Sequence, residues 1–300
     1  MRLKRKKTKI VGSLVFLTAT FLLSAGGLQA QTTYNLFVHG LSSSDHCAQI
    51  NNTTDGRTDL RGYWSGINFG GMPNVRFVGF APNATNGAFS WDSCGAQAQL
   101  ARALNTFCRR FNNHRCRIFT HSTGGLVLAR HLEYLQSAQL AHFYDIRYMR
   151  LMANASGGAE LASAAGTIQH IPLLGWLTGR NAVRDSVRIG PARDTFNHNR
   201  TAGLTLWLTS GEGRASYWAV TRPFLRGTND SVLSNHTMCG VNEVASFQRC
   251  PVGSGQVRHT NLFWRLSSRW DNYATDADQT MFVGNDHSAA RGQFVGAPSP

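Results

Sequence analysis

The segment from residue 117 to residue 126 constrains the fold more than any other feature of the chain. It reads Arg-Ile-Phe-Thr-His-Ser-Thr-Gly-Gly-Leu, which is a short apolar strand, a turn around Ser122 and the start of a helix. A tight strand-to-helix turn projects the serine hydroxyl out of a sheet, and small neighbouring residues permit the strained backbone. The following helix directs its amide groups and the positive end of its dipole at that hydroxyl. The segment therefore predicts an α/β fold with Ser122 as a nucleophile.

One residue departs from the usual form of this turn. Thr120 stands where a Gly-x-Ser-x-Gly pattern has its first glycine. The bulkier side chain predicts a slightly more open turn, or relaxed packing behind it. The alternative interpretation is a structural serine in an ordinary turn, and the strand before Ser122 and the helix after it argue against that.

Other strand-like and helical stretches alternate along the chain. Residues 95–111 have helical spacing, with Leu100, Ala103, Leu104, Phe107 and Cys108 on one side. Residues 125–135 form the second expected helix. The expected strands cover residues 34–38, 75–80, 117–119, 148–153, 204–208 and 280–283. This alternation predicts a mostly parallel central sheet covered by helices on both faces, in a single domain over residues 31–300.

The first thirty residues have the layout of a secretory signal peptide. A head with six basic residues precedes an apolar run over about residues 10–23, and small residues lead to Ala30. A membrane anchor is the alternative, but a spanning helix needs about 20 apolar residues. We therefore expect cleavage after Ala30, with the help of a secretion machinery, and a secreted or periplasmic protein with no integral membrane segment.

The net charge of +14 overstates how basic the exported chain is. Without the six basic residues of the head it is +8, and every remaining basic residue is an arginine. Nucleic-acid binding is one interpretation of this balance. The arginines are scattered, however, with no dense run and no interleaved aromatic residues. We therefore expect no nucleic-acid partner, but a basic surface that favours anionic interfaces.

Six cysteines follow the predicted cleavage site: Cys47, Cys94, Cys108, Cys116, Cys239 and Cys250. An even number in an exported chain predicts disulfides, although six cysteines allow 15 connectivities. Short loops favour Cys108–Cys116 and Cys239–Cys250, which leaves Cys47–Cys94. A metal site is the alternative, but no Cys-x-x-Cys or clustered Cys/His spacing supports one.

A second motif, His39-Gly40-Leu41, ends the first expected strand. Where a strand-to-helix turn carries a nucleophile, the loop after an early strand supplies one amide of an oxyanion hole, and the residue after the nucleophile supplies the other. We therefore expect the backbone N–H groups of Leu41 and Thr123 to fill these positions, with Gly40 allowing a close approach. An ordinary strand-to-loop turn is the alternative.

Four motifs together resemble those of bacterial extracellular lipases and related esterases of the α/β-hydrolase superfamily. They are His39-Gly40-Leu41, Thr120-His121-Ser122-Thr123-Gly124, Ser156-Gly157-Gly158-Ala159-Glu160-Leu161 and Gly227-Thr228-Asn229-Asp230-Ser231-Val232. The resemblance covers roughly residues 34–292 and is specific for the superfamily rather than for a substrate. Secreted polyhydroxyalkanoate depolymerases share the same features. The resemblance implies an α/β-hydrolase fold and a serine hydrolase.

The resemblance also implies the catalytic acid. In these lipases it lies in an Asn-Asp-Gly-x-Val segment after a late strand, which Asn229-Asp230-Ser231-Val232 matches with Ser231 in place of glycine. A buried carboxylate at Asp230 would orient the catalytic histidine and stabilise its charged form. The alternative is a solvent-exposed Asn-Asp turn.

Three histidines follow Asp230 and compete for the role of base, because the order in this fold is serine, acid, histidine. His287 follows residues 280–283, the last strand-like run, and is preferred. His259 precedes an amphipathic stretch, residues 261–270, and could open the last helix, with residues 256–257 as the true last strand. His236 lies close to Asp230 in the same loop and is the weakest candidate.

Residues 162–193 form an insertion rich in apolar residues, together with glycine, proline and arginine. It could pack on the core, or it could cover an apolar pocket like a lid. The expected reaction is acyl transfer from a carboxylic ester to Ser122, with no cofactor and no metal. The apolar insertion favours a lipid or a hydrophobic polyester over a small polar ester. The rival functions are a peptidase or amidase, and a catalytically silent binding protein, on the same fold.

Overall fold

The structure is a computed structural model that describes residues 30–42, 45, 47, 63–69, 71–168, 181–198, 200–225, 227–239, 257–260, 265–268, 281–283 and 286–292. Nearly all of the expected signal peptide lies outside these residues and stays a prediction. Contacts between Cα atoms group residues 31–300 into one unit. Within the described ranges, no helix has the length and apolar character needed to cross a membrane.

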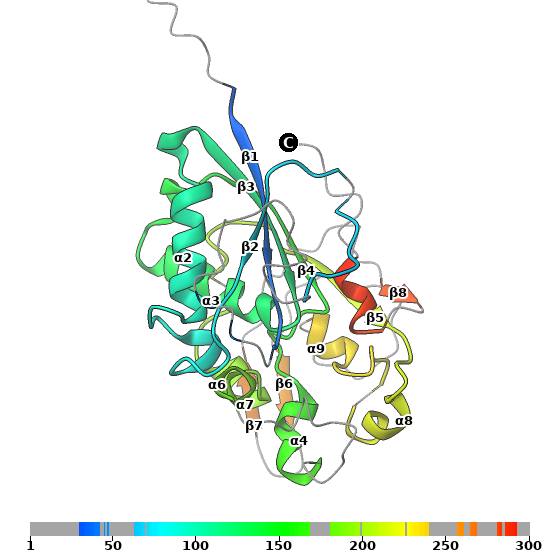
Figure 1. The fold of residues 1–300 in the computed structure, drawn as a ribbon. Coiled ribbons are helices and arrows are strands. Elements are labelled where there is room, and N and C mark those ends of the chain that lie inside the picture. The colour runs from blue at the N-terminus through cyan, green and yellow to red at the C-terminus, as the bar shows by residue number, and fades with distance from the viewer. Residues whose placement is uncertain are drawn as a thin grey trace, which may run out of the picture. The chain divides into compact units, whose positions relative to one another are not determined.

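A six-stranded sheet lies at the centre of this unit, and all of its neighbouring strands run parallel, in the order β2-β1-β3-β4-β5-β8 (Figure 1). The strands are β1 (Thr32–Val38), β2 (Val75–Val78), β3 (His114–His121), β4 (Ile146–Met152), β5 (Trp207–Glu212) and β8 (Met281–Val283). The predicted parallel sheet is therefore confirmed. β5 begins three residues later than expected, because the amide of Leu204 closes a turn onto the carbonyl of Thr201 at 3.0 Å.

The central strands are buried on both faces, which explains why they read as continuous apolar runs. In β1, Leu36 and Val38 pack into the main core, whereas Phe37 between them packs into a second cluster on the opposite face. In β3, Ile118 likewise packs into the main core and Phe119 packs into the second cluster. The strands therefore hold two apolar layers together.

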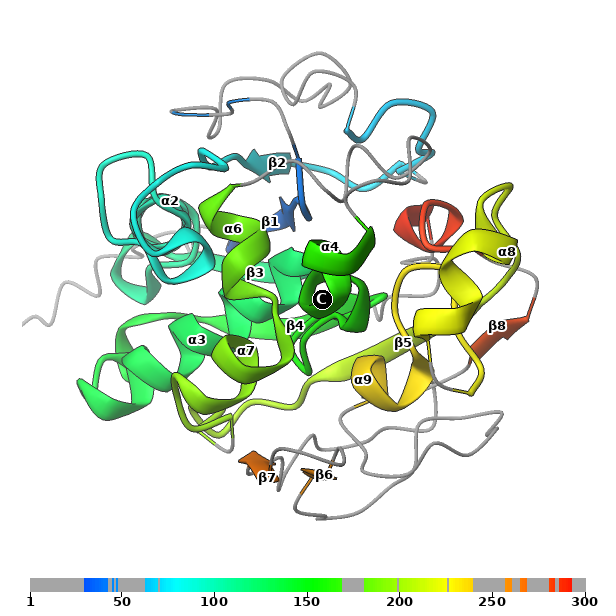
Figure 2. The ribbon, with the colours of Figure 1, turned by 90° about the horizontal axis from the view of Figure 1, so that it is seen from below.

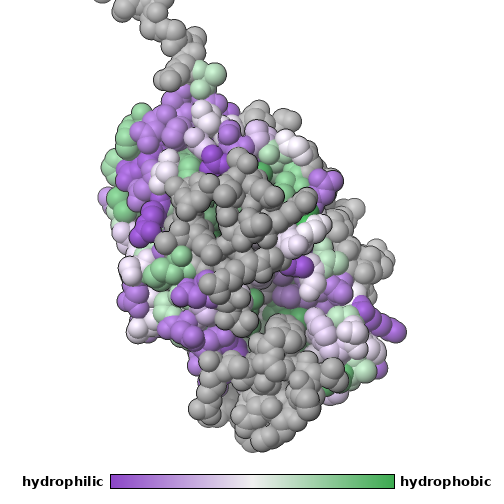
Figure 3. Space-filling model, in the orientation of Figure 1, coloured by the Kyte–Doolittle hydropathy of each residue, from purple (hydrophilic) through white to green (hydrophobic). Residues whose placement is uncertain are grey.

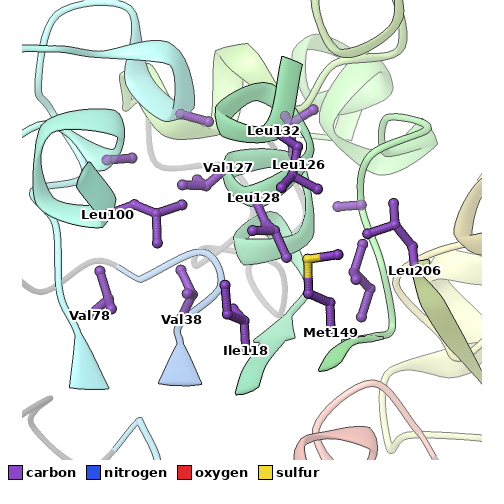
Figure 4. Packing of buried hydrophobic residues seen from close by; sticks show 14 of the residues in the cluster. Val38, Val78, Leu100, Ile118, Leu126, Val127, Leu128, Leu132, Met149 and Leu206 are labelled. Carbon is purple, nitrogen blue, oxygen red and sulfur yellow. The ribbon is translucent and has the colours of Figure 1, made fainter. Parts of the chain in front are cut away.

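Helices α2 (Ala96–Phe107) and α3 (Thr123–Ser137) cover the main core (Figure 4). The figure shows Leu100 of α2 and Val127, Leu128 and Leu132 of α3 above a row of apolar residues from the sheet. The buried positions of α2 include the predicted apolar side. α2 ends at Phe107 rather than at residue 111, because Cys108 turns the chain back and is joined to Cys116 in β3.

The opposite face of the sheet is packed by aromatic residues from the segment around residues 63–72. Phe37 stacks on Phe119 with ring centroids 4.8 Å apart, and Trp64 and Phe69 make edge-to-face contacts with Phe37 at centroid distances of 5.5 and 5.0 Å. Edge-to-face and offset contacts of this kind suit the charge distribution of aromatic rings. The packing fixes Tyr63, the neighbour of Trp64, at the end of the sheet where the candidate site lies.

Short helices follow the sheet strands on the side of the candidate site (Figure 2). They are α4 (Glu160–Ile168), α6 (Ala182–Ser186), α7 (Ile189–Asp194), α8 (Trp218–Thr221) and α9 (Asn235–Cys239), with 3₁₀ turns η1 (Gly87–Phe89), η5 (Arg222–Phe224) and η6 (Ala289–Gly292). Two other 3₁₀ turns, η2 (Arg110–Asn112) and η3 (Ala141–Phe143), directly precede β3 and β4 at the other end of the sheet. The expected insertion contains α6 and most of α4 and α7. Val183 and Val187 pack on the core, while residues 169–180 lie outside the described residues. The role of the insertion as a cover therefore stays a prediction.

Two further strands, β6 (Val257–Thr260) and β7 (Arg265–Ser268), pair with each other in a separate antiparallel sheet. The expectation of a helix over residues 261–270 is therefore wrong for residues 265–268, which instead pair with β6. Residue 257 also does not belong to the last strand of the central sheet. That strand is β8, which lies at the sheet edge beside β5, as the preferred interpretation predicted.

Two of the three expected disulfides lie within the described residues, and both are formed. Cys47–Cys94 and Cys108–Cys116 have Cα–Cα distances of 4.9 and 5.2 Å, within the usual range. Cys250 and the side chain of Cys239 lie outside the described residues, so that pair stays a prediction. On the face shown in Figure 3, hydrophobic residues of the described surface form small groups among hydrophilic ones.

Candidate active site

Ser122 lies in the turn between β3 and α3, at a backbone conformation that is unusual for a residue with a side chain. Its φ is 55° and its ψ is −122°. The Ser122 amide donates to the carbonyl of Met152 at 3.0 Å, and its carbonyl accepts from Gly125 and Ala155 at 3.0 and 3.1 Å. These bonds, to β4, to the loop after it and to the first turn of α3, hold a conformation that costs about 1–3 kcal/mol.

Two glycines allow the backbone to pack closely around this turn. A β-carbon at Gly40 would lie 2.7 Å from the β-carbon of Ser122, and one at Gly124 would lie 2.6 Å from the carbonyl oxygen of Val38. Both distances are too short for ordinary contacts. The loop after β1 and the first turn of α3 can therefore meet only because these residues have no side chain.

Thr120, which stands in place of the usual glycine, has a fully buried side chain. Its hydroxyl lies 3.5 Å from the point where a β-carbon of Gly125 would stand, which is an ordinary contact distance. That β-carbon would instead lie 2.1 Å from Asn154 Oδ1, so Gly125 leaves room for Asn154. The predicted adjustment of the turn around Thr120 stays a prediction.

The expected acid and the preferred base meet in the structure. His287 Nδ1 lies 2.7 Å from Asp230 Oδ2, and the His287 amide donates to the Asp230 carbonyl at 2.9 Å. The other oxygen, Asp230 Oδ1, accepts from the amides of Val232 and Leu233 at 2.9 and 2.7 Å. Asp230 is fully buried. Because a carboxylate accepts, Nδ1–H of His287 donates to it, and Nε2 faces away with its lone pair available in the neutral ring.

Ser231 occupies the position where the resembling lipases have glycine, and its φ of 77° explains that preference. Three hydrogen bonds stabilise the serine here. Its amide donates to Asn229 Oδ1 at 3.0 Å, its hydroxyl donates to the carbonyl of Gly213 at 2.9 Å, and the same hydroxyl accepts from the amide of Ala215 at 2.9 Å. The loop that presents Asp230 is thus fixed without a glycine.

The other two histidines lie elsewhere. His236 is buried in α9, with Nε2 3.4 Å from Glu160 Oε1. Burial raises the pKa of Glu160 to about 7, and a hydrogen bond from Ser234 opposes this shift. His259 lies in β6, paired with Leu266 of β7, and its side chain is outside the described residues.

Both expected oxyanion donors border the candidate site. Leu41 and Thr123 line the same pocket as Ser122. Thr123 is the first residue of α3, where the helix supplies no acceptor for its N–H. His39 supports the loop that presents Leu41: its Nε2 accepts from the amide of Phe80 at 3.2 Å, and its Nδ1–H donates to the Gly40 carbonyl at 2.6 Å. The conformation of this loop therefore depends on His39.

Tyr63 and His121 also support the site, although no motif in the sequence indicates this role for either of them. His121 Nε2 donates to the carbonyl of His287 at 2.8 Å, so its Nδ1 accepts from the Tyr63 hydroxyl at 2.5 Å. Burial lowers the pKa of His121 well below its usual value, and a charge on His287 lowers it further. Neutral His121 thus connects Tyr63 to the segment that carries His287. The only signal in the sequence is the position of His121 directly before Ser122.

A pocket of about 310 Å³ opens above Ser122 and His287. Its apolar lining includes Ala155, Ala159 and Ala162 after β4, and Val187, Val232 and Leu233. Its polar lining includes Tyr63, Tyr217, Arg184 and Arg291. Among the described residues, no three His, Cys, Asp or Glu side chains form a group that could hold a metal ion.

The parallel sheet with α2 and α3 on one face, and the strand-turn-helix at Ser122, define an α/β-hydrolase fold. No protein-family profile and no curated protein matches the chain. Among solved structures, it is similar to the mature lipase BlEst2 from Bacillus licheniformis, at 16% identity and a TM-score of 0.53, with 89% of each chain covered.

Two further solved structures are similar at lower scores. The phospholipase PlaB from Legionella pneumophila matches at 18% identity and a TM-score of 0.45, over 70% of this chain and 46% of that one. The metagenomic carboxyl esterase MGS0156 matches at 16% identity and a TM-score of 0.44, over 70% and 60% of the two chains. At these identities the likeness concerns the fold alone.

Proposed function

We propose that the chain is a serine hydrolase that cleaves carboxylic esters through an acyl-enzyme intermediate. The observation that supports this most is the 2.7 Å contact between His287 and buried Asp230, in a site whose pocket both His287 and Ser122 line. The strand-turn-helix around Ser122 and the lipase-like fold support the same proposal. Each catalytic role below is part of this proposal.

In the proposed first step, Nε2 of His287 removes the proton of the Ser122 hydroxyl as its oxygen attacks the ester carbonyl. The amides of Leu41 and Thr123 bind the resulting oxyanion, and Asp230 stabilises the charged imidazole. The imidazolium then protonates the leaving alcohol as the carbon–oxygen bond breaks. In the second step His287 activates a water, which releases the acid and restores Ser122.

A hydrophobic acyl ester is the proposed substrate, presented by a lipid or polymer interface. Alanine, valine and leucine side chains line much of the pocket. A polyhydroxyalkanoate depolymerase is the alternative within ester hydrolysis. The two described disulfides support an exported protein, since such bonds persist in oxidising compartments. We therefore propose a secreted or periplasmic location.

The test is labelling with a fluorophosphonate, combined with hydrolysis of p-nitrophenyl butyrate. We expect the wild-type protein to react with the label and to hydrolyse the ester, and Ser122→Ala to do neither while keeping its circular dichroism spectrum. Ser137→Ala is the matched control, because Ser137 is an exposed serine at the other end of α3. It should behave like the wild type.

Each rival function gives a different result. Ordinary ester hydrolysis by folded Ser122→Ala would exclude the proposed nucleophile. A wild-type protein that neither reacts with the label nor cleaves any ester would be a binding protein on this fold. A chain-length series of p-nitrophenyl esters, with an emulsified triglyceride, a polyhydroxybutyrate film and a peptide anilide, separates the remaining substrate classes.

A further inference from the structure

The charged side chains that line the pocket have one sign. Arg184 and Arg291 line it, and no Asp or Glu does so among the described residues. Alanine, valine and leucine side chains form the apolar part of the lining, and the other lining residues are hydroxyl-bearing residues and histidines. A cleft with charge of one sign and low-dielectric walls focuses its field on whatever enters it.

Arg291 is fixed beside the proposed base. It lies in η6, four residues after His287. Its Nε donates to the carbonyl of Ser288 at 3.1 Å, its Nη1 donates to the carbonyl of Tyr63, and its guanidinium lies 5.4 Å from the Tyr63 ring centroid. These partners are neutral, so they orient the guanidinium without compensating its charge. Such orientation keeps the cation at the pocket wall.

Arg184 approaches the pocket from another part of the chain. It lies in α6, and α6 and η6 (the red helix) are on opposite sides of α4 in Figure 2. Arg184 is buried, and Nη2 lies 3.3 Å from Oδ1 of its neighbour Asp185. The Asp185 side chain is 58% exposed, so water weakens the attraction between these two side chains.

Among the described residues, Asp230 and Asp286 affect residues that line the pocket without lining it themselves. Asp230 is fully buried and is bonded to His287. Asp286 accepts from the amide of Ala289 at 2.9 Å and does not line the pocket. Both raise the pKa of Tyr217, a lining residue, but burial of Tyr217 is the larger cause. The two arginines are therefore the only charged side chains among the described residues that line the pocket.

We propose that Arg184 and Arg291 make the site selective for anionic esters, in which a carboxylate or phosphate is attached to the acyl chain or to the alcohol. This inference rests on the proposed ester hydrolase and names its substrate class. Guanidinium groups pair with carboxylate and phosphate oxygens through two parallel hydrogen bonds. The apolar wall would bind the hydrocarbon part of the same molecule.

Matched pairs of esters test the proposal without changing the reacting bond. Mono-p-nitrophenyl adipate and p-nitrophenyl hexanoate differ only in a terminal carboxylate on the acyl side. 4-Hexanoyloxybenzoate and its methyl ester differ in charge on the alcohol side. We expect wild-type kcat/KM to be about tenfold or more higher for the anionic member of at least one pair, after correction for spontaneous hydrolysis, because tenfold requires only one charge-assisted hydrogen bond.

Charge-removing variants identify the source of the selectivity. Arg184→Gln and Arg291→Gln should each lower the anionic-to-neutral ratio of kcat/KM several-fold, whereas Arg291→Lys should retain much of it. Arg102→Gln is the control, because Arg102 is an exposed residue of α2 and its loss changes the net charge equally. It should leave the ratio unchanged. The anionic-to-neutral ratio of kcat/KM does not change when part of a preparation is inactive, because both esters are measured with the same preparation.

The outcomes separate this proposal from the proposed function. Hydrolysis of the neutral esters with no wild-type preference for either anionic ester would overturn the selectivity and leave the ester hydrolase standing. A preference that persists in both glutamine variants would overturn the assignment to these arginines. No hydrolysis of any of the four esters would contradict the ester hydrolase itself.

Discussion

At the scale of single residues, two of the eight described non-glycine residues with positive φ lie where the chemistry is proposed. Ser122 and Ser231 both have positive φ values, and they belong to the turns that present the proposed nucleophile and acid. Each costs about 1–3 kcal/mol unless the surroundings compensate for it. In both turns, hydrogen bonds from neighbouring segments supply that compensation. The strained backbone conformations of Ser122 and Ser231 are therefore maintained by the hydrogen bonds that fix the two turns.

A pair of histidine substitutions tests the proposed base. His287→Ala should lower kcat on p-nitrophenyl butyrate by about three to six orders of magnitude, because Ser122 would lose the group that takes its proton. His259→Ala should change kcat little, because β6 belongs to a separate sheet. Steady-state kinetics with circular dichroism on both variants makes the comparison. A folded, active His287→Ala beside an inactive His259→Ala would reverse the assignment.

At the scale of elements, α2 and α3 are joined by a buried polar contact within the apolar core. Gln97 of α2 donates through Nε2 to the carbonyls of Ala88 and Val127, at 2.8 and 3.1 Å. Its Oε1 therefore faces His131 of α3 and accepts from Nδ1–H at 3.1 Å. Burial lowers the pKa of His131 to about 3, and the Arg130 charge lowers it further. The contact requires a neutral histidine.

This contact predicts a loss of stability in acid. As the pH falls below about 6.5, the unfolded chain binds a proton at His131 and the folded protein does not, so the free energy of unfolding decreases until the folded pKa near 3 is reached. Between pH 7 and 5 the decrease from this residue is about 2 kcal/mol. His131→Asn should remove it, as measured by urea unfolding at both pH values.

The control for this measurement is His142→Asn, since His142 is an exposed histidine on η3. It should keep the pH dependence of the wild type. Asparagine at position 131 also leaves a cavity, but that cost is the same at both pH values and cancels from the difference. An unchanged difference between pH 7 and 5 in His131→Asn would show that His131 does not carry the acid sensitivity.

At the scale of the whole molecule, the two described disulfides restrict the unfolded chain to different degrees. Cys108–Cys116 spans 8 residues and joins the end of α2 to β3. Cys47–Cys94 spans 47 residues and connects the loop after β1 to the segment before α2. A longer closed loop loses more entropy in the unfolded state, so the second bond should contribute more.

Removal of each bond by paired Cys→Ser substitutions tests this order. Loop entropy gives about 2.6 kcal/mol for Cys108–Cys116 and about 4 kcal/mol for Cys47–Cys94. Guanidinium unfolding of both double variants measures the difference. Intact-mass analysis of the exported protein should also show six hydrogens gained on reduction, which includes the predicted Cys239–Cys250 pair. Equal losses of stability, or a larger loss for the short loop, would contradict the entropic argument.

The sequence by itself was sufficient for features that depend on neighbouring residues. The strand-turn-helix at Ser122 could be read because its conformation is set within about ten residues, by apolar periodicity and small side chains. The parallel sheet followed from the alternation of such local patterns. The same reasoning failed over residues 265–268, where an amphipathic stretch pairs as β7 rather than forming a helix.

Only the tertiary structure decided which distant residues meet. In the sequence, His259 and His287 are both acceptable as the proposed base, whereas the structure places β8 at the sheet edge and brings His287 into contact with Asp230, 57 positions away. Tyr63 and His121 are 58 positions apart, and no local pattern connects them. Arg184 and Arg291 border one pocket for the same reason. Local sequence patterns indicate the conformation that the backbone prefers over a few residues. Which distant side chains contact each other depends on how all the elements pack together.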